Sequence, residues 1–203
     1  MTDEPTAPSA VGRYDATTAL IVVDVQNDFA DPDGGLYVAG GEQVVTPVNA
    51  EVAAAHNAGA TVAYTQDWHP ESTPHFEKDG GIWPVHCVAD TWGAELQRDL
   101  LVQGPVVRKG TGGEDGYSGF SVRDPVSGIP AETQLRSLLD PSIERLVVVG
   151  LAGDYCVKET ALDGVRLGYR VEVPLSLTRF VNLDPGDEQR SVDELRAAGV
   201  TVE

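Results

Sequence analysis

The sequence predicts an α/β domain built on a doubly wound, mainly parallel sheet of about six strands with helices on both faces. Two observations support this prediction. Short apolar runs alternate with segments of helical spacing from residue 18 to the end of the chain, an order typical of repeated strand–helix–strand units. The 203 residues suffice for one sizeable hydrophobic core but hardly for two, so we expect a single domain over 18–203.

Six apolar runs mark the expected strands. The run RLVVVGLA is apolar almost throughout, which is typical of a central parallel strand that is covered on both faces. The runs are ALIVVD (19–24), TVAYTQD (61–67), PVVRK (105–109), RLVVVGLA (145–152), RVEVPLSL (170–177) and VTVE (200–203).

Helices are expected between these runs. In residues 41–59 Ala and Val recur at helical spacing, and Gly59 suits a helix C-terminus. A helix over 132–140 would end before Pro141. Further helices are predicted over 91–101, 156–169 and 187–199. The stretch from Asp67 to about residue 93 is a long excursion with several Pro and Gly residues, and such loops are uncommon unless they are functional.

Composition and charge narrow the classes of partner. A formal net charge of −18 repels phosphate backbones and anionic lipid, so we expect neither nucleic acid nor a membrane surface as a partner. Residues 1–17 are expected to form a flexible, polar N-terminal tail without the apolar segment of a secretory signal. Because two cysteines cannot make a disulfide framework, we expect a reducing, cytoplasmic location.

Three residues with catalytic chemistry lie at the ends of predicted strands. Asp24, Lys109 and Cys156 follow apolar runs, and the carboxyl ends of parallel strands line the ligand crevice of such sheets. Cys156 would begin a helix, whose dipole, together with the Lys109 ammonium, is expected to lower the pKa of the thiol. Asp24 could accept and return the thiol proton. Taken alone, Cys156 could equally be a small buried hydrophobic residue.

Potential metal ligands gather in the long excursion. Asp67, His69, His75 and His86 lie within it, whereas His56 falls in the predicted helix over 41–59 and is expected at the surface. Imidazole and carboxylate are usual ligands of zinc, iron and manganese. We expect one divalent ion, zinc in the first place, with iron or manganese as alternatives that these ligand types leave open. Singly, each histidine could also be a polar loop residue bonded to the backbone.

Several short motifs in this order resemble the nicotinamidase/pyrazinamidase branch of the isochorismatase-like hydrolases. The resemblance covers about residues 18–203, and it implies the isochorismatase-like hydrolase fold. The motifs are VDVQNDF (23–29), DWHPESTPHF (67–76), WPVHC (83–87), RKG (108–110), YSGF (117–120) and GLAGDYCV (150–157).

The resemblance implies a role for each matched residue. Asp24, Lys109 and Cys156 match the family's catalytic triad, and the backbone N–H groups of Ala152 and Cys156 match its oxyanion hole. The peptide bond between Leu151 and Ala152 is expected to be cis. Asp67, His69 and His86 match the family's metal ligands, and His75 matches a ligand found in some members. The implied walls of the substrate pocket are Phe29, Trp83, Tyr117, Leu151 and Tyr155.

Three positions depart from the family pattern. Gly153 stands where a Thr is usual, Leu151 replaces a more common β-branched residue, and Ser176 occupies a place where relatives often carry Asp. None of the three removes a residue of the implied triad or metal site.

The implied reaction is hydrolysis of a small aromatic carboxamide, nicotinamide, to nicotinate and ammonia in NAD salvage, and conversion of pyrazinamide to pyrazinoate is expected as well. The metal is expected to bind the ring nitrogen, directly or through water. One alternative is a hydrolase of N-carbamoyl or other small amides, although such relatives generally lack the metal loop. A non-enzymatic, metal-stabilised binding module is a more distant alternative. The sequence leaves open whether the protein forms a homo-oligomer.

Overall fold

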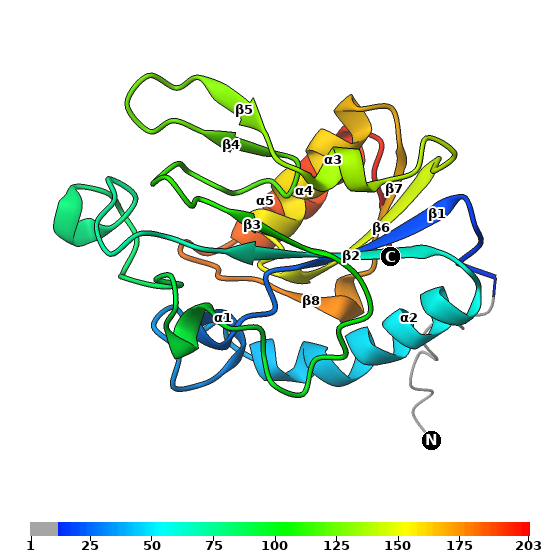
Figure 1. Ribbon diagram of the computed structural model, residues 1–203, viewed down its shortest axis with the longest axis horizontal. Coiled ribbons are helices and arrows are strands. Elements are labelled where there is room, and N and C mark those ends of the chain that lie inside the picture. Colours follow the sequence, from blue (N-terminus) through cyan, green and yellow to red (C-terminus); the bar gives the residue numbers. More distant parts are fainter. Residues whose placement is uncertain (1–11) are drawn as a thin grey trace.

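A computed structural model describes residues 12–203 of the chain (Figure 1). Its main sheet has seven strands, all parallel, and six of them follow the order β3-β2-β1-β6-β7-β9, while β8 pairs with β6. The strands are β1 (Thr18–Val23), β2 (Thr61–Asp67), β3 (Val106–Lys109), β6 (Arg145–Leu151), β7 (Arg170–Val173), β8 (Thr178–Arg179) and β9 (Thr201–Val202). The α/β prediction is confirmed, and the two-residue strand β8 is added to the six that the apolar runs indicated.

Helices cover both faces of the sheet, as a doubly wound fold requires (Figure 1). Helix α2 (Val45–Asn57), preceded by the 3-10 turn η1 (Gly41–Val44), packs on alternate β1 residues such as Leu20 and Val22. On the other face, α4 (Cys156–Arg166) packs on β6 and β7, and α5 (Asp187–Ala197) packs on β9 and beside α4, in a core that also includes Ala19, Ile21 and Val23. The shorter elements are α1 (Asn27–Ala30), η2 (Glu77–Asp79), η3 (Trp92–Ala94), α3 (Leu135–Leu138) and η4 (Leu175–Leu177).

The prediction of a helix over 91–101 is wrong. Only η3 forms there, because the following backbone pairs with the segment after β1 instead of with itself. Asn27 N donates to Glu95 O at 2.9 Å, and Gln97 N donates to Val25 O at 2.9 Å. The helix expected over 132–140 is reduced to α3 (Leu135–Leu138), and its first residue, Glu132, belongs to an antiparallel hairpin of β4 (Ser121–Arg123) and β5 (Pro130–Glu132) that the sequence did not suggest.

The expected tail over 1–17 is partly anchored. Within its described part, residues 12–17, Tyr14 is buried and its hydroxyl donates to Glu51 at 2.6 Å. Arg13 pairs with Glu51 at 3.1 Å and with Glu172 at 2.8 Å. The boundary of the folded domain therefore lies before residue 18, and residues 1–11 are outside the described part. Among the described residues, no helix is long and apolar enough to cross a membrane.

The register of the sheet sets the position of the site. β1 lies between β2 and β6, so the segments that follow these three strands share one edge. Asp67, the last residue of β2, is in register with Lys109, the last residue of β3. Asp24 follows β1 directly, and Cys156 begins α4 shortly after β6. Parallel pairing thus brings the chemically important strand ends together.

Candidate active site

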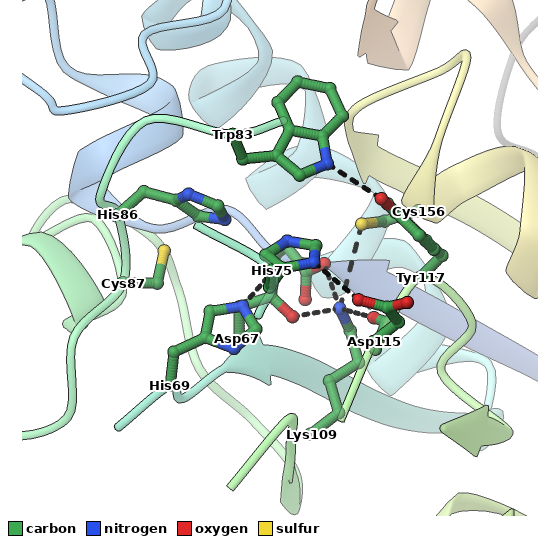
Figure 2. Close-up of polar contacts among 12 residues, drawn as sticks. Asp67, His69, His75, Trp83, His86, Cys87, Lys109, Asp115, Tyr117 and Cys156 are labelled. Carbon is green, nitrogen blue, oxygen red and sulfur yellow. Dashed lines mark hydrogen bonds and ion pairs between the residues drawn. The ribbon is translucent and has the colours of Figure 1, made fainter. Parts of the chain in front are cut away.

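The Lys109 ammonium is the centre of a fully buried cluster (Figure 2). Its Nζ lies 2.8 Å from Oδ2 of Asp24, 2.5 Å from Oδ1 of Asp67 and 3.7 Å from Sγ of Cys156. It also donates to the backbone carbonyl of Gly116. The three residues expected as a catalytic triad therefore meet around one ammonium group, and Asp67 from the expected metal site meets them there.

Burial, together with the charges of the two carboxylates and the ammonium, sets the pKa values in this cluster. Burial alone would lower the pKa of Lys109, but Asp24 and Asp67 raise it well above its usual value. Burial and the two nearby carboxylates raise the pKa of Cys156 well above its usual value, although Lys109 opposes them. The expectation of a lowered thiol pKa is thus wrong for the resting site, since a thiolate would add a further negative charge to an already anionic pair. Cys156 rests as a thiol beside a carboxylate.

Two backbone features hold these groups in place. Asp24 has a left-handed φ of 47°, which is uncommon for a residue other than glycine, and its Oδ1 accepts a hydrogen bond from Thr65 Oγ1 at 2.7 Å. Gly110 has a φ of 75°, and a Cβ there would lie 2.7 Å from the His69 ring. Glycine directly after the lysine therefore lets the chain turn beside that imidazole.

Three buried imidazoles form a second cluster next to the first. One ring nitrogen each of His69, His75 and His86 lies within 4.8 Å of the others. Nδ1 of His86 bonds the carbonyl of Pro84 at 2.7 Å, and Nδ1 of His75 bonds Asp115 Oδ1 at 2.8 Å, so that both Nε2 atoms are free to bind a ligand. Within residues 12–203, neither nitrogen of the buried His69 ring has a hydrogen-bond partner.

The chemistry of this cluster fits a divalent cation. Burial lowers the pKa of His86 to about 4 despite Asp67, and burial also lowers the pKa of His75 despite Asp115. Both rings are therefore neutral at pH 7, which is the state that binds metal. Asp67 supplies a carboxylate whose Oδ2 lies 3.8 Å from Nε2 of His69. Unpartnered, buried ring nitrogens are costly without a ligand, so the residues present suit a metal ion. His56 is exposed in α2, as expected.

The segment between β6 and α4 forms a turn at the floor of the site. Its peptide bond between Leu151 and Ala152 is cis, as the resemblance implies. The carbonyl of Ala152 accepts hydrogen bonds from Tyr155 N and Val157 N, at 3.1 and 3.0 Å. Cys156 is the first residue of α4, where backbone N–H groups have no partner inside the helix. The turn therefore presents N–H groups next to the thiol.

An aromatic cavity opens over the thiol and the imidazoles. Trp83 Nε1 donates to the Tyr117 hydroxyl at 2.8 Å, and the Trp83 ring meets Tyr155 edge-on with centroids 4.8 Å apart. Leu151, expected in the wall, is fully buried in the core instead and does not line the cavity. The lining residues include Phe29, Leu36, Val38, Asp67, His75, Trp83, His86, Tyr117, Ala152, Tyr155, Cys156 and Val181.

Several of these residues were missed because their contacts are distant in sequence. Leu36, Val38 and Val181 line the cavity, and Asp115 bonds His75, yet none belongs to a motif that the sequence made conspicuous. The departure from the family pattern at Gly153 is also explained by a residue that is distant in sequence. A Cβ at Gly153 would lie 2.6 to 2.8 Å from ring carbons of Phe180, so Phe180 occupies the space of a side chain at 153.

Ser176, another position that departs from the family pattern, lies outside the site. It is exposed in η4 and does not line the cavity, so this departure from the family pattern leaves the pocket unchanged.

Comparisons with known proteins show to which family the chain belongs. A protein-family model described as "Isochorismatase domain" matches residues 18–203 of the chain. This chain belongs to the isochorismatase family. The nicotinamidase of Escherichia coli (strain K12) is 36% identical to this family member over 91% of the chain and 93% of its own length.

Two solved structures resemble this isochorismatase-family chain over nearly their whole length. Pyrazinamidase of Pyrococcus horikoshii, solved in complex with zinc, has a TM-score of 0.80 at 35% identity and covers 92% of this chain and 98% of its own. The PnC1 protein of L. infantum, solved in complex with nicotinate, has a TM-score of 0.82 at 36% identity and covers 93% and 92%.

Proposed function

We propose that this protein is a metal-dependent cysteine amidohydrolase that converts nicotinamide to nicotinate and ammonia. One observation carries the proposal: the buried Asp24–Lys109–Cys156 cluster and the imidazole cluster adjoin a single cavity with aromatic walls, which Cys156, His75 and His86 line. Relatives named nicotinamidase, similar over nearly the whole chain, support the same substrate. Pyrazinamide, which has a similar ring and the same amide group, is a further expected substrate.

The proposed chemistry begins from the resting thiol. Sγ of Cys156 attacks the amide carbon while its proton passes to Asp24, which lies in the same buried cluster. The carbonyl oxygen becomes an oxyanion that accepts hydrogen bonds from the backbone N–H groups of Ala152 and Cys156. The C–N bond then breaks as Asp24 returns the proton to nitrogen, and ammonia leaves behind a thioester.

Hydrolysis of the thioester completes the cycle. Asp24 removes a proton from water, the hydroxyl oxygen bonds to the acyl carbon, and the C–S bond breaks. Asp24 returns that proton to Sγ of Cys156, and the carboxylic acid loses its own proton to solvent and leaves as nicotinate. Lys109 keeps Asp24 and Asp67 ionised through ion pairs of 2.8 and 2.5 Å, so Asp24 stays a base in a buried setting where it would otherwise take up a proton.

Four residues would hold the proposed metal. Asp67, His69 and His86 are the expected ligands, and His75 is a further one, since one of its ring nitrogens belongs to the same group and its Nε2 has no bond to Asp115. A bound divalent ion supplies a Lewis-acidic contact for the ring nitrogen or for water. We propose zinc because a solved relative was crystallised with it, and because imidazole and carboxylate ligands suit it.

The alternative, an N-carbamoyl or other small-amide hydrolase, is less well supported. Its use of the same triad is compatible with Asp24, Lys109 and Cys156, but it gives no role to a cluster of three buried imidazoles, two of which line the cavity. A cytoplasmic location remains a prediction, and whether the protein forms a homo-oligomer stays open.

The test is ammonia release from nicotinamide by the wild type, by Cys156→Ala and by Cys87→Ala. The two cysteines are both buried and free, which makes Cys87→Ala the matched control. We expect Cys156→Ala to lose turnover and Cys87→Ala to retain it. A chelator should abolish turnover and zinc should restore it. Equal rates in the wild type and Cys156→Ala would refute the cysteine mechanism, whereas turnover that survives full chelation would refute the metal role.

A further inference from the structure

Asp115 contacts the imidazole cluster from the loop between β3 and β4. Its Oδ1 lies 2.8 Å from Nδ1 of His75, whose side chain is 5% exposed, whereas that of Asp115 is 29% exposed (Figure 2). The contact bridges forty positions of the sequence. Asp115 is not among the residues to which a metal or catalytic role was assigned above.

The backbone around Asp115 is held firmly in place. Asp115 N donates to Arg123 O and Arg123 N donates to Asp115 O, both at 2.8 Å, which fixes the residue to the first strand of the β4–β5 hairpin. The next carbonyl, of Gly116, accepts from the Lys109 ammonium. The loop that carries His75 is fastened to the same segment, because Thr73 Oγ1 donates to Gly113 O at 2.8 Å. Both partners of the contact therefore have a fixed backbone.

Within the described part of the chain, His75 differs from the other two imidazoles in its partner. Nδ1 of His86 bonds a carbonyl in its own loop, that of Pro84, and His69 has no hydrogen bond. Only the His75 ring bonds a carboxylate through Nδ1. Such a carboxylate holds the proton on Nδ1, turns the lone pair of Nε2 toward the site and makes the ring a stronger ligand.

We infer that Asp115 is a positioning residue that fixes His75 as a ligand of the metal, so that the fourth protein ligand depends on the loop between β3 and β4. The inference rests on the proposed function, which supplies the metal. The hairpin contributes to this role as well, because the pairing of Arg123 in β4 with Asp115 holds Asp115 beside His75. His69 and His86 would bind without this support.

The test measures metal binding directly. Zinc affinity is determined by competition with a chromophoric chelator, and cobalt absorption spectra report coordination, for the wild type, Asp115→Asn, Asp115→Ala and Glu114→Gln. We expect Asp115→Ala to weaken affinity by roughly 10- to 100-fold and to alter the cobalt spectrum. Asp115→Asn, which keeps an acceptor oxygen but not the charge, should lose less. Glu114→Gln, a neighbouring carboxylate bonded only to the turn at Gly112, should match the wild type.

A double-mutant cycle separates positioning from general loss of structure. If Asp115 acts through His75, Asp115→Ala should have no further effect on affinity in a His75→Ala background. Unchanged affinity in Asp115→Ala, or equal losses in both backgrounds, would overturn the inference. A wild type that binds metal but releases no ammonia would refute the proposed reaction alone. A wild type that binds no metal would refute both.

Discussion

Replacing Lys109 with Met tests how the central cluster is held together. The substitution keeps a side chain of similar length but removes the ammonium that lies 2.5 and 2.8 Å from two carboxylates. In the metal-free protein, Asp24 and Asp67 then face each other in a buried site with no counter-ion. We expect both stability and turnover to fall, the latter because Asp24 is no longer held as an ionised base.

The geometry sets the size of the effect. At an effective dielectric of about 20, each ion pair at these distances is worth roughly 6 kcal/mol of gross attraction. Desolvation cancels much of that gain, and breaking a buried ion pair typically costs about 3–5 kcal/mol. For a chain of this size, such a loss lowers Tm by roughly 6–20 °C.

The pH dependence of the loss follows from the carboxylates. Burial already raises the pKa of Asp24 although Lys109 opposes it, so removing Lys109 raises that pKa further. A carboxyl with a raised folded-state pKa contributes stability that is fully present below its unfolded value near 3.8 and is lost as pH rises through the folded value. The gap in stability between variant and wild type should therefore widen from acidic to neutral pH.

The assay is urea denaturation at several pH values, with ammonia release measured in parallel. Lys158→Met is the matched control, because Lys158 pairs at 3.0 Å with the exposed Glu194 and should cost no more than about 1 kcal/mol. Adding Asp67→Asn to Lys109→Met should recover stability by removing one of the facing charges. A Lys109→Met protein as stable as the control, or a double variant less stable than the single one, would refute the electrostatic argument.

Two further predictions concern the neighbourhood of this cluster. Gly153→Thr should lower the free energy of unfolding by about 1–3 kcal/mol, since a Cβ at this position would lie 2.6 to 2.8 Å from the Phe180 ring. A second change, Phe180→Leu, should restore the Tm. A Tm unaffected by Gly153→Thr would contradict this prediction. The pKa of His86 is about 4, mainly because of burial, whereas the unfolded chain protonates it near 6.5. The free energy of unfolding of the chelated protein should therefore fall by roughly 3 kcal/mol between pH 6.5 and pH 4, and it should fall less in His86→Asn. Urea titrations in which both proteins lose the same stability with pH would contradict this.

The sheet and its chemically important edge were predictable because both depend on local patterns. Val-rich runs form the central strands, and parallel pairing places their carboxyl ends at one edge whatever the exact register. Asp24, Asp67 and Lys109 were conspicuous since each ends an apolar run. The same argument fails for the segment 91–101, where the spacing of Leu96 and Leu100 resembles a helix but hydrogen bonds to the segment after β1 prevent it.

The protonation of Cys156 could not be predicted from the same patterns. A helix N-terminus and a nearby lysine both favour the thiolate, and both are present. What outweighs them is full burial and a second carboxylate, Asp67, that the sequence assigned only to the metal site. Local motifs give the identity of the groups, whereas their protonation depends on how many charges the fold places in one enclosed volume.

Asp67 shows why the two halves of the site cannot be treated separately. Oδ1 pairs with the Lys109 ammonium at 2.5 Å, while Oδ2 lies 3.8 Å from Nε2 of His69. Because Asp67 is in register with Lys109 on the neighbouring strand, a one-residue slip between β2 and β3 would break its contact with the ammonium, while His69, on the same segment as Asp67, would stay beside it. A cation beside Oδ2 would offset part of the negative charge around the Lys109 ammonium. It would thereby lower the free-energy cost of ionising the Cys156 thiol. The pairing of two short strands thus couples the nucleophile to the imidazoles through a single carboxylate.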